Sequence, residues 1–428
     1  MQYFSTNNRM NKADFRQATL QGQPADKGLY FPEVIPVLPK SFLTALKQIP
    51  KEEVAFEVIK PYIGNTIDHN TLRKIIAETI AFDFPLVKIT DSISTLELFH
   101  GPTLAFKDVG ARFMSRCLSY FSQDAKNKTT VLVATSGDTG GAVANAFYNV
   151  ENVEVVILYP SGKVSDIQEL QLTTLGNNIT ALEIDGAFDD CQKMVKDAFA
   201  DKDLNERIFL TSANSINVAR WLPQQFYYFY AYQQWGEDEP PVVAVPSGNF
   251  GNICAGILAH LSGLPVKHFI AACNANDITS HYLNTGDLIS RPSSPTLSNA
   301  MDVGNPSNFV RILEMFSHQH QSLKNILSSY CISDDETIRT ITEVKKNYNY
   351  LLDPHGAVGF ASLQQYLNDK EAKGFFLETA HPVKFNVDKI IKEKVELPVA
   401  VQSLFTRQKS SIQMKADAME LKEFLLSR

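Results

Sequence analysis

The sequence predicts an α/β protein built mainly on parallel β-sheet. From about residue 95 onward, short runs rich in β-branched residues alternate with segments whose apolar residues recur at helical spacing. This alternation is typical of right-handed βαβ units. The candidate strands are nearly continuous in Val, Ile and Leu, which indicates that helices cover both faces of the sheet. Before residue 95 helical spacing dominates, so we expect a helical N-terminal region.

The candidate elements follow in order along the chain. Apolar spacing predicts helices within 41–64, interrupted at Pro50 and Pro61, and within 71–82. Strands are then expected at 129–134, 153–160, 179–186, 240–246 and 266–274. The intervening helices are expected at 140–150, 164–176, 188–200 and 252–263. We interpret the acidic segment 230–240 as a linker. The stretch 285–308 is long for a loop and is a candidate functional loop or lid.

Composition excludes several classes of function. The chain of 428 residues is long enough for two or three domains, and its formal net charge of -7 with no basic run argues against nucleic-acid binding. No apolar run approaches membrane-spanning length, and the polar N-terminus does not resemble a secretory signal. The five cysteines are scattered without CxxC or zinc-type spacing. We therefore expect reduced thiols, no metal site and a cytoplasmic location.

Lys107 is the candidate catalytic residue. It follows the apolar run 104–106 in a segment that opens with Gly and Pro. Apolar surroundings disfavour the ammonium form of lysine, and a neutral amine can form a Schiff base with an aldehyde cofactor such as pyridoxal phosphate (PLP). An isolated lysine beside Asp108 would be interpreted as a residue at the start of a surface helix. The loops farther along the chain favour the catalytic interpretation.

Two glycine-rich loops each connect a strand to a helix. They are 135–141 (TSGDTGG) and 246–252 (PSGNFGN). Backbone N–H groups at a helix N-terminus attract anions, and glycine lets the backbone approach them closely. Neither loop contains the lysine of a Walker A motif or matches GxGxxG. One such loop could be a tight connection without a ligand, but two of them with Lys107 predict a site for two anions.

Other polar residues carry weaker signals. Lys163 lies at the end of a predicted strand, where ligands bind in open α/β sheets, and Arg220 lies downstream of Asn214. Arginine suits bidentate contact with phosphate. By spacing alone, both cations are better interpreted as surface residues. The single histidines His355 and His381 stand in turn-like segments and are interpreted as structural.

Five segments, taken together, resemble the threonine synthase family, whose members are PLP enzymes of the tryptophan-synthase-β fold type. They are HGPTLAFKDVGARFM, TSGDTGGAVANAF, PSGNFGN, TLSNAMDVGNPSN and ETAHPVKF. The resemblance extends from DKGLYFPEVIP near the start to HPVKF. It implies PLP fold type II, with two open twisted parallel-sheet α/β domains. The implied division is a helical region 1–95 packing on the large domain, a small domain 96–225 with the Schiff-base lysine and substrate loop, and a large domain 226–428 with the PLP-phosphate loop.

The resemblance also implies a role for each site residue. Lys107 would form the Schiff base, Thr379 would bond the pyridine nitrogen, and Asp138 would lie near the ring hydroxyl. The PLP phosphate would be held by Gly248, Asn249, Phe250, Gly251 and Asn252. The substrate carboxylate would be held by Thr135, Ser136 and Thr139. The substrate phosphate would be held by Lys163, Asn214 and Arg220. Two residues depart from the family pattern: Glu378 stands at a usually small position, and Val383 at a usual Ala.

The implied reaction converts O-phospho-L-homoserine and water into L-threonine and phosphate, with Lys107 moving protons and closure of the small domain excluding water. The implied assembly is a monomer or weak homo-oligomer. One alternative is a serine/threonine dehydratase or cysteine-synthase-like enzyme, in which Lys163→Ala should have little effect. A second is a non-catalytic binding protein, against which the intact Lys107 argues. A third is an NAD enzyme, against which the missing GxGxxG motif argues.

Overall fold

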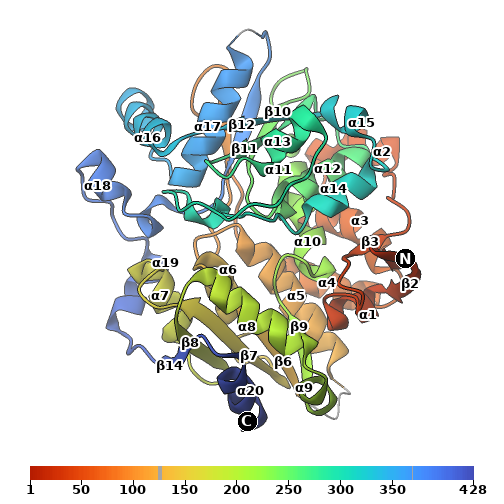
Figure 1. The fold of residues 1–428 in the computed structure, drawn as a ribbon. Coiled ribbons are helices and arrows are strands. Elements are labelled where there is room, and N and C mark those ends of the chain that lie inside the picture. Colours follow the sequence, from red (N-terminus) through yellow and green to blue (C-terminus); the bar gives the residue numbers. More distant parts are fainter. Residues whose placement is uncertain (124–127, 369) are drawn as a thin grey trace.

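Two large sheets with helices on both faces form the body of the protein. The computed structural model describes residues 1–123, 128–368 and 370–428. In Figure 1 a six-stranded sheet and its helices occupy the upper half, and a five-stranded sheet and its helices occupy the lower half. The predicted α/β class is confirmed, and each sheet is mainly parallel. None of the described helices is both long enough and apolar enough to cross a membrane.

The upper sheet is buried on both faces. In spatial order its strands are β12 (Leu327–Cys331), β11 (His268–Cys273), β10 (Val242–Pro246), β13 (Gly374–Glu378), β5 (Ile93–Glu97) and β4 (Leu86–Lys88). All neighbours are parallel except β4 and β5. Its main helices are α11 (Gln225–Gln234), α12 (Gly251–Leu261), α16 (Asp334–Tyr348) and α17 (Pro354–Leu367). Val243 belongs to the core of α11 and α12, whereas Val242 belongs to the core of α16 and α17.

The lower sheet follows the same principle. Its strands are β14 (Ile412–Lys415), β8 (Ile179–Asp185), β7 (Val153–Pro160), β6 (Thr129–Ala134) and β9 (Phe209–Ser212), and all pairs are parallel. The surrounding helices are α5 (Lys107–Phe121), α6 (Asp138–Phe147), α7 (Asp166–Thr173), α8 (Phe188–Ala200), α9 (Lys202–Arg207) and α20 (Ala418–Leu426). Val131 packs in the core with α5 and α6, and its neighbour Leu132 packs in the core with α8 and α20. The continuous apolar strands therefore reflect burial on both faces, as predicted.

The predicted strands agree with the structure to within two residues at each end. Two other expectations need correction, and a third, the long loop at 285–308, agrees with the structure. Pro61 does not interrupt its helix, because it lies in the last turn of α3 (Lys51–Ile63), near the helix end. The first part of 230–240 is helical, since α11 continues to Gln234, whose side chain donates to the Phe84 carbonyl. The stretch 285–308 is irregular except for the short turn η3 (Asn299–Met301), between α13 (Ile278–Thr285) and α14 (Phe309–Met315).

The N-terminal region is not purely helical, in contrast to the prediction. It opens with an antiparallel sheet of β1 (Gln2–Ser5), β2 (Asn8–Asp14) and β3 (Tyr30–Pro32). The helices α1 (Phe15–Gln21), α2 (Lys40–Ala45), α3 and α4 (His69–Thr79) complete it. The short strand β1 is held by buried aromatic side chains, including Tyr3, whose hydroxyl donates to the Tyr62 carbonyl at 2.8 Å. The helix α3 packs on α11, while α4 packs on α5, so this region contacts helices of both halves.

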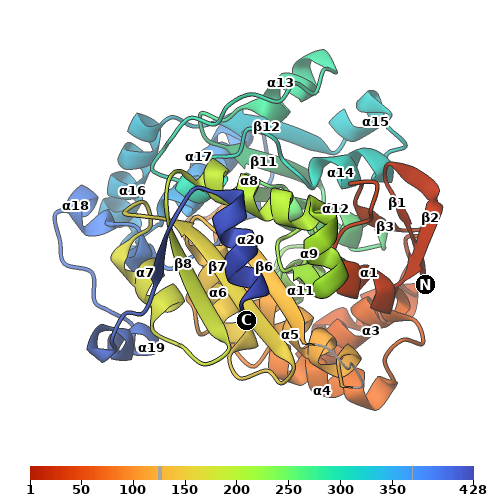
Figure 2. The same ribbon diagram turned by 60° about the horizontal axis from the view of Figure 1, so that its bottom comes forward.

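The chain returns to the lower half at its C-terminal end. After β13 it passes through the turn η4 (Pro382–Lys384) and the helices α18 (Val387–Ile391) and α19 (Val399–Gln402). It then adds β14 to the edge of the lower sheet and packs α20 on α8, as Figure 2 shows from below. The strand pairing therefore differs from the expected division at 96–225 and 226–428. The strands β4 and β5, which lie at 86–97, likewise belong to the upper sheet.

Candidate active site

A polar cavity of about 130 Å³ lies where the carboxyl ends of strands from the two sheets meet the starts of α5, α6 and α12. It brings together every site residue expected from the sequence except Lys163. These are Lys107, Thr135, Ser136, Asp138, Thr139, Asn214, Arg220, Gly248, Asn249, Phe250, Gly251, Asn252 and Thr379. The two glycine-rich loops, far apart in the sequence, therefore lie on one cavity with Lys107. This juxtaposition is the one expected of a site for two anions.

Lys107 begins α5 and is held by contacts with the upper sheet. The N–H of Phe106 donates to the Thr379 carbonyl at 2.8 Å, and an antiparallel bridge joins Ala105 to Ala380. The side chain of Lys107 is 17% exposed, and its Nζ lies 4.8 Å from the centroid of the Phe106 ring. Burial, together with the nearby cations, lowers the pKa of Lys107 and outweighs the opposite effect of Asp138. At a given pH, the Lys107 side chain is therefore a neutral, nucleophilic amine in a larger fraction of the molecules than a free lysine would be.

Asp138 is the anionic centre of the cavity, and a residue that was given no role in the sequence analysis holds it there. The Nζ of Lys384 lies 2.6 Å from Oδ1 of Asp138, whereas Nζ of Lys107 lies 3.7 Å from Oδ2. The amide of Gln168 donates to Oδ1 at 2.9 Å. Burial alone would raise the pKa of Asp138, but the two ammonium groups and the hydrogen bonds hold it well below its usual range. Lys384 also donates to the Thr103 carbonyl at 2.9 Å and is fully buried.

The loop 246–252 forms a cradle at the start of α12. Phe250 adopts a left-handed conformation with φ 60°, and α12 begins at the next residue. A Cβ at Gly248 would lie 2.7 Å from the Cα atom of Met301, so only glycine fits there. The Tyr228 hydroxyl donates to Oδ1 of Asn252 at 2.8 Å, and Nδ2 of Asn252 is buried without a partner among the described residues. An unpaired donor beside a helix N-terminus fits a phosphate group.

The loop 135–141 is organised by Thr135 itself. Its Oγ1 accepts from the N–H of Gly137 at 3.0 Å and of Gly140 at 2.8 Å, so this hydroxyl shapes the loop and does not face the cavity as a free ligand. Gly137 has φ 134°, and a Cβ there would lie 2.4 Å from the Gln168 side chain. Ser136 and Thr139 line the cavity at the start of α6. They are the loop's remaining polar side chains that can contact an anion.

Arg220 and Asn214 form a second polar wall. Arg220 is 3% exposed, and burial lowers its pKa to about 10. Its Nη1 donates to the Ala213 carbonyl, whereas its Nε has no partner among the described residues. Within the same part of the chain, Oδ1 of Asn214 is also buried without a partner. Lys163 is not part of this wall: it is exposed, because the turn at Gly162, with φ 66°, follows β7 and ends outside the cavity.

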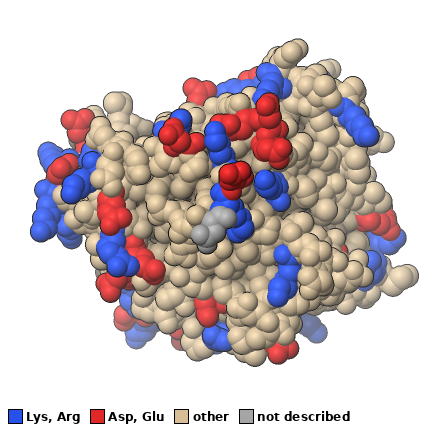
Figure 3. Space-filling view, turned by 90° about the horizontal axis from the view of Figure 1, so that it is seen from above, with Lys and Arg blue, Asp and Glu red and all other residues tan. Residues whose placement is uncertain are grey.

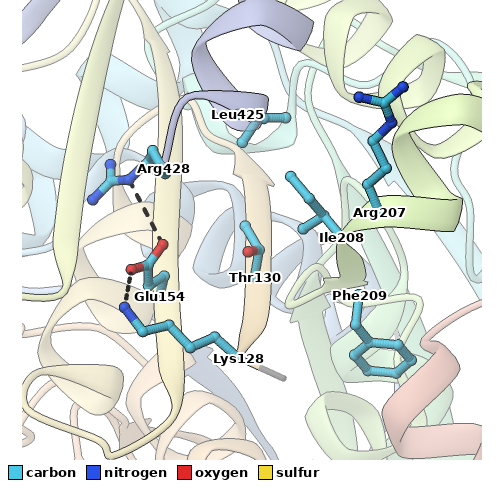
Figure 4. Close-up of a pocket in the computed structure, with 8 residues that line it drawn as sticks. All are labelled: Lys128, Thr130, Glu154, Arg207, Ile208, Phe209, Leu425 and Arg428. Atoms are coloured by element: carbon cyan, nitrogen blue, oxygen red, sulfur yellow. Dashed lines mark hydrogen bonds and ion pairs between the residues drawn. The ribbon is translucent and has the colours of Figure 1, made fainter. Parts of the chain in front are cut away.

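A larger cavity of about 310 Å³ lies at the opposite, amino ends of the lower-sheet strands (Figure 4). Its three cations already have carboxylate partners. Lys128 and Arg428 pair with Glu154 at 2.8 and 3.6 Å, and Arg207 pairs with Asp203 at 2.9 Å. Volume alone would favour this cavity, but its described lining residues include no lysine in apolar surroundings and no glycine at a helix N-terminus. We therefore place the chemistry at the smaller cavity.

Charged residues elsewhere give no comparable site. On the face seen from above in Figure 3, Lys and Arg side chains are interspersed with Asp and Glu. In the described part of the chain, no three or more His, Cys, Asp or Glu residues are grouped so that they could hold a metal ion. All five cysteines are free thiols, and only Cys331 is exposed.

The fold, the lysine and the two glycine loops define a PLP-dependent enzyme of fold type II, and comparisons with known proteins agree. The family models for pyridoxal-phosphate dependent enzymes, for the threonine synthase N terminus and for the threonine synthase C-terminal part match residues 94–375, 2–80 and 356–425. The chain belongs to the threonine synthase family.

Individual relatives match over their full length. A threonine synthase of Buchnera aphidicola is 42% identical, with 100% of both chains covered. The crystal structure of threonine synthase from Escherichia coli superposes with a TM-score of 0.94 at 40% identity, again covering 100% of both chains. A PLP-bound threonine synthase from Brucella melitensis superposes with a TM-score of 0.92 at 35% identity, covering 99% of this chain and 98% of that one.

Proposed function

We propose that this chain is a threonine synthase that converts O-phospho-L-homoserine and water into L-threonine and phosphate with PLP as its cofactor. The observation that carries the proposal is the cavity itself. It joins Lys107, a glycine loop at a helix N-terminus, and a separate buried wall in which the Arg220 Nε has no partner among the described residues. The reaction needs one place for the cofactor phosphate and another for the substrate phosphate, and the cavity offers two such places.

The residues of the upper half would hold the cofactor. Gly248, Asn249, Phe250, Gly251 and Asn252 would bind its phosphate with backbone N–H groups and the free Asn252 amide. Thr379 would face the pyridine nitrogen with a neutral hydroxyl. PLP, when bound, supplies an electron sink for negative charge that develops on the substrate. Asp138, kept ionised by Lys384, would stabilise positive charge near the ring and the lysine.

Lys107 would carry the cofactor and then move protons. Its lowered pKa suits a group that must accept a proton from the substrate Cα near neutral pH. Loss of protons from Cα and Cβ allows the Cγ–O bond to break with release of phosphate. A proton delivered to Cγ would then form the methyl group, water would add at Cβ, and a proton returned to Cα would complete L-threonine. A single tunable amine within reach of these atoms accounts for most of the transfers.

The lower half would hold the substrate. Ser136, Thr139 and the N–H groups that begin α6 would bind the carboxylate, with Thr135 shaping the loop. Arg220 and Asn214 would bind the substrate phosphate. Arg220 is suited to this because its guanidinium is buried and has an unpaired donor. We leave Lys163 out of the proposed clamp, since it is exposed and lies away from the cavity.

The decisive experiment measures phosphate release and threonine formation from O-phosphohomoserine by the PLP-loaded protein. Equal amounts of both products are expected, with turnover lost in Lys107→Ala. Arg220→Ala should raise KM for phosphohomoserine by at least about tenfold, because a charge-assisted contact contributes about 1.5–3 kcal/mol. Lys163→Ala, a matched loss of one cation, should leave KM within about twofold. Bound PLP without release of phosphate would refute the proposed reaction.

The proposal places the enzyme in the cytoplasm as a monomer or weak homo-oligomer. Free thiols at all five cysteines support a reducing compartment. All the proposed site residues come from one chain, so the site needs no contribution from a second copy. Sedimentation at micromolar concentration tests the oligomeric state.

A further inference from the structure

The segment 299–303 lies directly on the phosphate loop. Its Asp302 carboxylate accepts from Asn274, Asn276 and Thr296, and a histidine contacts the segment at Ala300. All its residues line the cavity, and the backbone of Met301 contacts Gly248 so closely that a Cβ on the glycine would lie 2.7 Å from the Met301 Cα atom. One residue earlier, the N–H of Ala300 donates to Nε2 of His355 at 3.3 Å. The position of His355 therefore influences where this segment lies above the loop.

Asp353 orients the histidine. Nδ1 of His355 lies 2.5 Å from Oδ1 of Asp353, and both side chains are buried. The same oxygen accepts from the backbone N–H of His355 at 2.7 Å, as the N-cap of α17. Because Nε2 accepts a hydrogen from Ala300, the imidazole must carry its own hydrogen on Nδ1 and donate it to Asp353. The ring is also packed against Phe385, with centroids 4.8 Å apart.

Glu378 continues the chain beneath Asp353. It is fully buried, and its Oε1 accepts from the N–H of Asp353 at 2.6 Å. Burial and the adjacent Asp353 carboxylate raise the pKa of Glu378 well above its usual range, which favours its protonated form. Oε2 of Glu378 and Oδ2 of Asp353 are both buried without a hydrogen-bond partner among the described residues. Room for this carboxyl group depends on Gly356, where a Cβ would lie 1.6 Å from Oε2 of Glu378.

We propose that Glu378, Asp353 and His355 form a buried positioning chain that fixes residues 299–303 over the cofactor-phosphate loop and so slows the release of PLP. A proton on Glu378 would join the two unpartnered oxygens and so satisfy both carboxyl groups. It leaves Asp353 able to accept from Nδ1, which in turn leaves Nε2 free to accept from Ala300. His355 is a positioning residue, not a catalytic one. The inference rests on the proposed function only in taking this cavity as the PLP site.

A matched pair of variants at His355 tests the chain in the PLP-loaded protein. His355→Asn keeps an amide where Nδ1 lies but does not reach Ala300, whereas His355→Gln places an oxygen near the position of Nε2. Amide hydrogen exchange in the peptide that contains 299–303 is the main measurement. Loss of one hydrogen bond should speed exchange at Ala300 by about fivefold in the Asn variant. The Gln variant should stay within about twofold, and PLP dissociation should follow the same order.

Both His355 variants lose the ring packed on Phe385, so a general packing defect would affect them equally. Equal acceleration in the two, or unchanged exchange in His355→Asn, would overturn the proposal. Thermal denaturation of both variants monitors the fold. Hydrogen exchange is measured without turnover. If the two variants showed the expected difference but the wild-type protein made no threonine, the proposed function would be refuted and the positioning chain would stand.

The shared proton is tested at Glu378. In Glu378→Gln an amide N–H replaces the proton between the two side chains, so exchange at Ala300 should match the wild type within about twofold. Glu378→Leu has similar size but leaves the Asp353 oxygen without that donor, and exchange should be about fivefold faster or more. Equal exchange rates in the Gln and Leu variants would show that no proton connects Glu378 to the histidine.

Discussion

Replacing Lys384 by Met removes the cation that lies closest to Asp138. In the wild type, the Asp138 carboxylate is neutralised by Lys384 at 2.6 Å and by Lys107 at 3.7 Å. The variant would keep only the longer contact and the Gln168 hydrogen bond. Removing one partner of a buried ion pair costs about 3–5 kcal/mol, because the remaining charge stays buried. Since Asp138 keeps two partners, we expect the lower limit, a loss of about 3 kcal/mol in the free energy of unfolding.

The assay is urea unfolding of the cofactor-free protein at neutral pH, with Lys389→Met as the control for loss of an exposed lysine nearby. The control should change the free energy of unfolding by less than about 0.5 kcal/mol. The double variant Lys384→Met/Asp138→Asn removes the orphaned charge and should recover most of the loss. A single variant as stable as the wild type, or a double variant less stable than the single one, would refute the assignment of Lys384 as the partner of Asp138.

The same substitution should also change Lys107. The positive charge of Lys384 is one cause of the lowered pKa of Lys107. Its removal leaves Asp138 to stabilise the Lys107 ammonium, so the pKa of Lys107 should rise. The pH at which the cofactor-free protein takes up PLP at half its maximal rate should therefore move upward in Lys384→Met. An unchanged or downward-shifted pH profile would show that Lys384 does not act on Lys107 through charge.

Two further predictions concern Asp108, which follows Lys107 in α5, and Gly248 in the phosphate loop. Burial raises the pKa of Asp108 to about 6 from the ordinary 3.8, so the folded state binds a proton that the unfolded chain releases. This contribution to stability is present below about pH 4 and lost as the pH rises to about 6, and Asp108→Asn should flatten that part of a urea-stability profile. Gly248→Ala would push a methyl group onto Met301 and should weaken PLP binding at least about tenfold by equilibrium titration, whereas Gly236→Ala, which has open space around it, should not.

The strands β6, β7, β8, β10 and β11 could be predicted because burial on both faces leaves a strong local signal. Runs such as TTVLVA and VEVVILYP are too apolar and too β-branched for a surface helix. The strands β1 and β14 were missed because each has only four residues. Strand β1 pairs with its neighbours β2 and β3, whereas the pairing of β14 depends on residues 179–185, far away in the chain. Register with a distant strand leaves no trace in local spacing.

The site shows the same contrast. The glycine loops and Lys107 were found because they combine unusual residue types in a short stretch. The sequence analysis did not find the roles of Lys384, Asp353 and Glu378. These roles arise because each side chain is buried against groups elsewhere in the chain. Lys163 shows the reverse case: a cation at a strand end fitted the expected pattern, but in the structure it is exposed and is not among the residues that line the cavity.

The return of the C-terminal segment to the lower sheet has a consequence for synthesis. The ribosome releases β6, β7 and β8 more than 220 residues before β14, which pairs with β8. Until then the edge of β8 and the face of α8 that contacts Leu421 and Leu425 have no cover from this chain. A nascent chain in this state presents an open strand and an apolar helix face, which favours aggregation or capture by chaperones. Pairing of β14 and packing of α20 therefore determine when the lower half of the nascent chain is protected from aggregation.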